Sequence, residues 1–82
     1  MEKHRYMKIG NTILKNIEFR QISSQRMIAT VASLEVGDIT KHLGGFMAYC
    51  TLTNSRLIVG SIELAQHFIR KNYLFAVTQI LK

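Results

Sequence analysis

The chain has a single cysteine, Cys50, among only 82 residues, and this limits what it can fold into. One cysteine excludes an intrachain disulfide, and the scattered His and Cys residues cannot supply the roughly four closely spaced ligands of a zinc site. The chain must therefore rely on a small apolar core, which buries only a little over ~60% of the unfolded surface. We expect a single domain over residues 1–82 and, because so small a core is weak, a homodimer.

The surroundings of Cys50 indicate a reducing compartment. It lies in an apolar run, where a cysteine usually acts as a small buried hydrophobe. Unpaired cysteines are typical of such compartments, so we expect a cytoplasmic protein. No apolar stretch reaches the ~18 residues that a membrane span needs, and no apolar segment follows the charged start over residues 1–6. The sequence therefore predicts neither a membrane span nor a signal peptide.

The formal net charge of +6 is unevenly distributed. Residues 1–26 carry +4, residues 27–69 carry −1, and residues 70–82 carry +3. If the two ends meet in the fold, they form one positive face that attracts nucleic acid, anionic lipid or an acidic protein surface. The competing interpretation is a charge that only keeps the protein soluble.

Alternating apolar residues predict strands in the first half of the chain. Residues 12–22 fit either a helix or a strand, and we favour a strand over residues 16–22 with a turn at Ser23–Gln25. Residues 26–36 share apolar side chains on one face at a period of two, which predicts a second strand. We expect Gly37 to end it.

The middle of the chain predicts a helical turn and a hairpin. Asp38 is a suitable N-cap for a short helical turn over residues 39–43, which Gly44-Gly45 would end. Two runs rich in aromatic and β-branched residues follow, joined by the polar pair Asn54-Ser55. Such an arrangement is typical of a β-hairpin, with strands over residues 46–53 and 56–59.

The second half predicts the main helix. Ser61 is a plausible N-cap for a helix over residues 62–71, and Arg70-Lys71 in its last turn would complement the helix dipole. Asn72 can adopt the left-handed conformation that ends a helix. The tail, residues 73–81, fits either a final strand buried on both faces or more helix.

These elements predict an α+β fold. The sheet would be small and antiparallel, with about four to five strands. The main helix, residues 62–71, would pack on it, and the short helical turn, residues 39–43, would connect two strands.

The sequence predicts no enzyme, no metal site and no cofactor. The histidines are scattered; His42 lies beside a Gly-Gly turn, where a polar residue is usually exposed, and we expect His67 to be a half-buried packing residue. Gly44-Gly45 is not followed by the Gly-Lys-Ser/Thr of a phosphate-binding loop. No serine has the context of a nucleophile elbow.

The basic N-terminal segment is the strongest functional signal. Tyr6 lies between Arg5 and Lys8, and Phe19 precedes Arg20, an interleaving that holds single-stranded nucleic acid when it occurs on a sheet. Alternatively, Phe19 belongs to the core and Tyr6 covers it. Protein partners are bound by the same residue types. The candidate binding residues are Lys3, Arg5, Tyr6, Lys8, Lys15, Arg20, Arg26, Arg70 and Lys71.

The stretch Leu52–Val59 resembles two known hairpins. It looks like the strand–turn–strand of bacterial pleckstrin-homology-like domains. With Gly60 it is also similar to the hairpin of Sm-like RNA-binding barrels, although Ser55 stands where that family prefers Gly. Each resemblance implies a local hairpin, and neither implies a function for the chain.

We therefore expect a small non-enzymatic binding protein that docks a basic face onto an acidic protein or nucleoprotein surface. Its size and type fit regulators or inhibitors, including those carried by phages and other mobile elements. The alternative is direct binding of RNA or single-stranded DNA.

Overall fold

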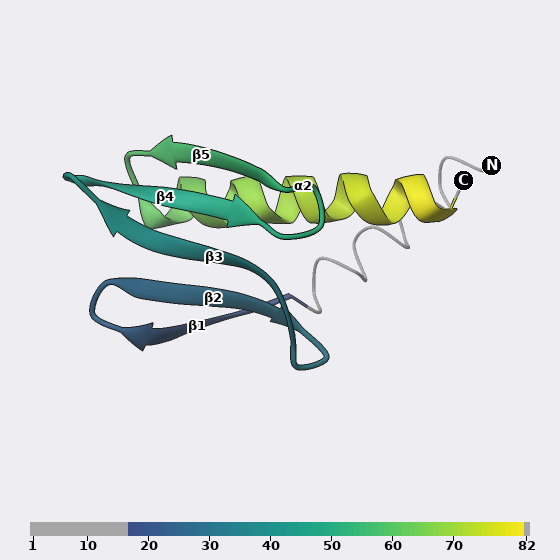
Figure 1. Ribbon diagram of the computed structural model, residues 1–82, viewed down its shortest axis with the longest axis horizontal. Helices are drawn as coiled ribbons and strands as arrows, with labels where there is room; N and C mark the ends of the chain where they lie inside the picture. Colours follow the sequence, from purple (N-terminus) through teal and green to yellow (C-terminus); the bar gives the residue numbers. More distant parts are fainter. Residues whose placement is uncertain (1–16, 82) are drawn as a thin grey trace.

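The computed structural model describes residues 17–81, which form five strands and one long helix (Figure 1). All strand pairs are antiparallel, and the strands lie side by side in chain order. This confirms the predicted α+β fold, with five strands in the sheet. The elements are β1 (Glu18–Ser23), β2 (Arg26–Val31), β3 (Leu34–His42), β4 (Gly45–Cys50), β5 (Ser55–Val59) and α2 (Ile62–Leu81).

Two tight turns with positive φ angles connect β2, β3 and β4. Ala32 and Ser33 have φ angles of 50° and 69°, and Leu43 and Gly44 have φ angles of 43° and 84°. Positive φ at both central residues is the mark of a type I′ turn, whose twist matches that of paired strands. The single strand predicted over residues 26–36 is therefore wrong, because the chain turns after β2. The sequence did not indicate this turn, since it lacks the Asn or Gly that usually signals one.

The helical turn predicted over residues 39–43 is also wrong, because these residues belong to β3 and the turn after it. Gly37 does not end a strand but lies inside β3. A Cβ atom at Gly37 would stand 2.6 Å from the backbone oxygen of Tyr49 and 3.2 Å from Cγ2 of Ile69. Because this glycine has no side chain, β4 and α2 can approach it closely, and it does not end the strand.

Helix α2 begins as predicted but ends much later. The hydroxyl of Ser61 accepts a hydrogen bond from the backbone N–H of Leu64 at 3.2 Å, as an N-cap does. The predicted helix end at Asn72 is wrong, and of the two alternatives left open for residues 73–81 the structure has more helix, because α2 continues through this segment. Asn72 stays helical, and its side-chain amide donates to the carbonyl of Phe68 at 2.9 Å. No Gly or Pro interrupts the tail.

The helix packs on one face of the sheet through small side chains. Ala29 and Ala48 are completely buried and share the core with Ala65 and Ile69 of α2. Cys50 is fully buried as well, which confirms its predicted role as a small hydrophobe. Helix α2 contacts β3, β4 and β5, and no helix or strand formed by residues 17–81 covers the opposite face of the sheet (Figure 1).

Candidate functional site

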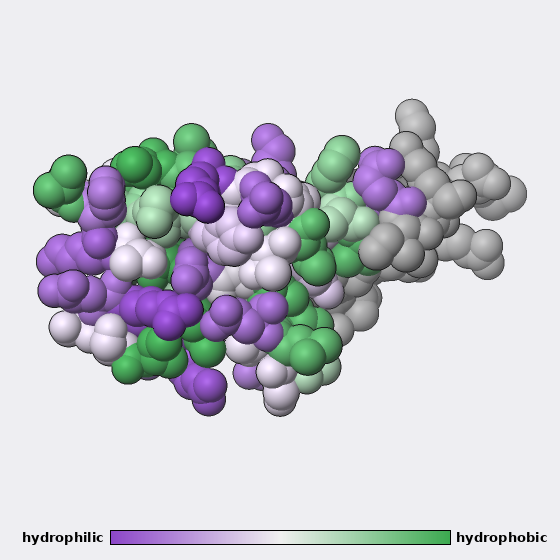
Figure 2. Space-filling view, in the orientation of Figure 1, coloured by the Kyte–Doolittle hydropathy of each residue, from purple (hydrophilic) through white to green (hydrophobic). Residues whose placement is uncertain are grey.

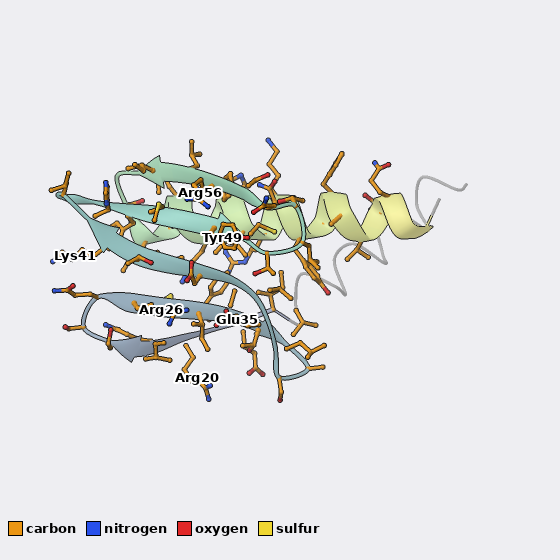
Figure 3. All side chains as sticks on the ribbon, viewed as in Figure 1. Arg20, Arg26, Glu35, Lys41, Tyr49 and Arg56 are labelled. Atoms are coloured by element: carbon orange, nitrogen blue, oxygen red, sulfur yellow. The ribbon has the colours of Figure 1, made fainter. Side chains whose placement is uncertain are left out.

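The face of the sheet turned away from α2, hereafter the outer face, carries one row of paired residues across all five strands. Side chains alternate between the two faces along each strand, so directly paired residues share a face. Arginines stand at both ends of the row, on β1 and β5 (Figure 3). The successive partners are Arg20, Ile28, Asp38, Tyr49 and Arg56.

Arg26, also on the outer face, is paired with two acidic side chains. Its Nη2 lies 3.1 Å from Oδ2 of Asp38 and 3.8 Å from Oε1 of Glu35. Such solvent-exposed pairs stabilise a fold by only about 0.2–1 kcal/mol each. The main effect of these ion pairs is to offset the charge of Arg26, which is one of the predicted binding residues.

Tyr49 and Arg56 are in contact on the outer face. The Cζ atom of Arg56 lies 5.5 Å from the centre of the Tyr49 ring, a cation–π contact, and the Tyr49 hydroxyl hydrogen-bonds with Oδ1 of Asn54 at 2.9 Å. Sequence reasoning missed this pair. The hairpin prediction placed the two residues on facing strands, but it misplaced the turn, which covers residues 51–54.

Arg70 brings the C-terminal basic segment into contact with β1, which lies in the N-terminal basic segment, although not on the face that carries Arg20. Its Cζ atom lies 4.8 Å from the centre of the Phe19 ring on β1. Phe19 packs against the core on the helix side of the sheet, whereas the neighbouring Arg20 points to the outer face. Arg70 and Lys71 lie in the middle of α2 instead of its last turn, and Lys71 is exposed.

The other predicted binding residues and much of the charge lie outside the described residues. Residues 17–81 contain six of the 11 Lys and Arg residues and four of the five acidic residues. They therefore account for +2 of the net charge of +6. The five predicted binding residues that fall outside this range are Lys3, Arg5, Tyr6, Lys8 and Lys15.

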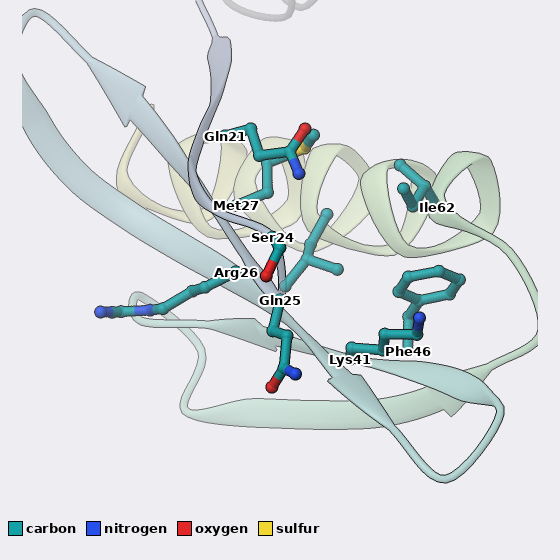
Figure 4. Close-up of a pocket in the computed structure, with 9 residues that line it drawn as sticks. Gln21, Ser24, Gln25, Arg26, Met27, Lys41, Phe46 and Ile62 are labelled. Carbon is teal, nitrogen blue, oxygen red and sulfur yellow. The ribbon is translucent and has the colours of Figure 1, made fainter.

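A shallow pocket opens on the helix side, between the β1–β2 turn and the start of α2 (Figure 4). Its cavity volume is about 30 Å³, far below the roughly 300–1,000 Å³ of small-molecule sites. Its lining contains no His, Cys, Asp or Glu side chain, so it has no acid–base pair for catalysis. The lining residues are Gln21, Ser24, Gln25, Arg26, Met27, Ile39, Lys41, Phe46 and Ile62.

The two histidines of residues 17–81 lie outside this pocket. His42 is exposed near the β3–β4 turn, and His67 is exposed on α2, so the prediction of a half-buried His67 is wrong. Among these residues, no three His, Cys, Asp or Glu side chains gather where they could hold a metal ion. In the same part of the chain, no helix is long and apolar enough to cross a membrane.

No protein-family model, no curated protein and no solved structure matches this chain.

Proposed function

We propose that the protein is a small non-enzymatic binding protein, a regulator or inhibitor, which docks the outer face of its sheet onto a protein whose carboxylates meet Arg20 and Arg56. The observation that carries this proposal is the arginine at each end of the cross-strand row. Arg20 and Arg56 make no ion pair with an acidic side chain of residues 17–81. Two arginines held at the opposite ends of one cross-strand row, with Tyr49 beside Arg56, can meet two carboxylates of a partner.

The composition of the outer face favours a protein over a nucleic acid as the partner. Its three arginines are matched by three acidic residues, so the face offers phosphates no large excess of positive charge. It also carries a single aromatic side chain, Tyr49, whereas a stacking surface for bases uses several. Tyr and Arg are enriched in protein interfaces, and Figure 2 shows polar and apolar side chains intermixed on this side.

The free thiol of Cys50 fits the same proposal. It is completely buried, and no second cysteine exists in the chain to oxidise it to an intrachain disulfide. We expect the protein to act in the cytoplasm, where such thiols stay reduced.

Direct nucleic-acid binding is the alternative, and it would depend chiefly on the basic residues outside 17–81. An electrophoretic shift with generic RNA and single-stranded DNA at two salt concentrations separates the two classes of partner. A protein partner predicts no shift at moderate salt and capture of the same protein from native lysate with or without nuclease. A shift that weakens steeply with salt, together with capture that nuclease abolishes, would replace our proposal by the alternative.

A further inference from the structure

The edge strand β5 exposes large apolar side chains on both of its faces. Leu57 points to the helix side and is 48% exposed, and its neighbour Ile58 points to the outer face and is 57% exposed. An edge strand also presents unpaired backbone N–H and C=O groups. The opposite edge, β1, carries Glu18 and Arg20, charges that hinder pairing with another strand. The edge at β5 is therefore better suited than the edge at β1 to pair with another strand.

One side of α2 continues this apolar edge. Gln66 and Arg70 reach toward β2 and β1, where they contact Met27 and Phe19. Residues two positions earlier on a helix point almost the opposite way, because each step turns the helix by about 100°. Leu64 and Phe68 therefore face the β5 side, and Leu64 is 54% exposed.

We infer that β5 pairs with β5 of a second copy of this chain, antiparallel about a two-fold axis at Leu57. With the axis perpendicular to the sheet, this register pairs all five residues of β5. It sets Arg56 opposite Ile58 of the second copy, so that the aliphatic stem of Arg56 covers that side chain. An axis at Arg56 would set two arginines directly opposite each other, and an axis at Ile58 would pair fewer residues of the strand.

The distance between the two α2 helices favours a second copy of the chain over a short peptide as the partner that pairs with β5. Helix α2 packs chiefly over β4, so the two helices would be separated by three strand spacings, or roughly 14 Å. This exceeds the ~8–10 Å between closely packed helices, and large side chains are needed to fill the gap. Leu57, Leu64 and Phe68 of both copies occupy that space. A single bound peptide strand would leave Leu64 uncovered.

The low charge of this edge is also suited to self-association. Strand β5 carries one charge, Arg56, and the chain as a whole carries +6. Two copies of so basic a chain associate most easily through such an apolar edge.

Cross-linking tests the register directly. The axis at Leu57 brings the Cα atoms of the two copies of this residue within about 4.5–5.5 Å of each other. A disulfide can bridge this spacing. The full chain carrying Leu57→Cys should form a covalent dimer with oxidised glutathione, and the chain carrying Ile58→Cys should not. No covalent dimer of Leu57→Cys, or a more efficient one of Ile58→Cys, would overturn the proposed pairing.

Sedimentation equilibrium with matched substitutions tests the interface without cysteine. The wild-type chain should have twice the mass of its 9.4 kDa monomer. Leu64→Glu should give monomers while keeping the fold, because Ser61 followed three residues later by Glu forms a capping box at the start of α2. The control Leu43→Glu, at an exposed leucine in the β3–β4 turn, should remain dimeric. A monomeric wild type, a dimeric Leu64→Glu or a monomeric Leu43→Glu would contradict the inference. None of these changes alters the outer-face arginines, so the outcome is independent of the proposed function.

Discussion

The guanidinium of Arg70 lies over the ring of Phe19, with 4.8 Å between Cζ and the ring centre. This contact joins the middle of α2 to the edge strand β1, which the helix otherwise covers little. It also places a cation from the C-terminal basic segment beside the N-terminal strand. Strand β1 and Arg70 are therefore adjacent, but the basic side chains of Arg20 and Arg26 point to the side of the sheet away from Arg70.

Removing the Arg70 side chain should loosen β1. A cation–π contact that is partly exposed contributes about 0.5–1 kcal/mol, so Arg70→Ala should lower the free energy of unfolding by that amount. Urea denaturation followed by circular dichroism measures this change. The neighbouring Lys71→Ala provides the control, since Lys71 is exposed and should have little effect. Equal losses for the two variants would show that the ring contact contributes nothing specific.

A methyl group at Gly37 should destabilise the fold more strongly. The added Cβ would stand 2.6 Å from the backbone oxygen of Tyr49, which cannot move without shifting β4. Overpacking of this kind costs about 1–3 kcal/mol, and we expect a loss in that range for Gly37→Ala. Gly60→Ala is the matched control, because no atom lies within 4 Å of the position of its Cβ. A Gly37→Ala variant as stable as Gly60→Ala would refute the close approach of β3 and β4.

Replacing Leu43 by asparagine should stabilise the protein. Leu43 is 96% exposed and has a φ angle of 43°, a conformation that asparagine tolerates better than leucine. Leu43→Asn also creates the Asn-Gly sequence preferred in type I′ turns, so we expect a gain of up to about 1 kcal/mol. Thermal unfolding should show a higher midpoint for this variant. Leu34→Asn, at another exposed leucine without positive φ, should bring no such gain.

The N-cap of α2 gives a fourth prediction. Loss of the Ser61 hydroxyl leaves the N–H of Leu64 without its partner, and Ser61→Ala should therefore cost about 1 kcal/mol. Ser61→Asp keeps an acceptor and should retain wild-type stability. Chemical denaturation of the two variants compares them. If Ser61→Asp loses as much stability as Ser61→Ala, the cap does not stabilise the helix.

Strand alternation and capping rules predicted the fold class, the start of α2 and strand β1 from the sequence. These rules failed where the same residue type occurs in two different structural settings, such as a glycine that can end a strand or allow a close contact within one. Gly37 was interpreted as a strand end, although its lack of a side chain serves a close contact with Tyr49 that only the folded sheet creates. Ala32-Ser33 turns the chain in a conformation that neither residue prefers, because the pairing of β2 with β3 outweighs local preference.

The candidate site was less predictable than the fold, because it depends on strand register. Arg20 and Arg26 were identified from charge alone, but their surroundings differ: Arg26 is paired with acids and Arg20 is not paired with any acid of residues 17–81. Tyr49 and Arg56 became a pair only once β4 and β5 were aligned. A turn misplaced by one or two residues changes every such neighbour.

The central claim is that the outer face binds a protein through Arg20 and Arg56. The most direct test compares the affinity of a protein captured from lysate for the wild type, for the Arg20→Glu/Arg56→Glu variant and for Lys71→Glu, which alters the charge on the other side of the molecule. We predict that the double variant binds at least roughly tenfold more weakly while staying folded, and that Lys71→Glu binds like the wild type. Unchanged binding by the double variant, or an equal loss in Lys71→Glu, would contradict the account.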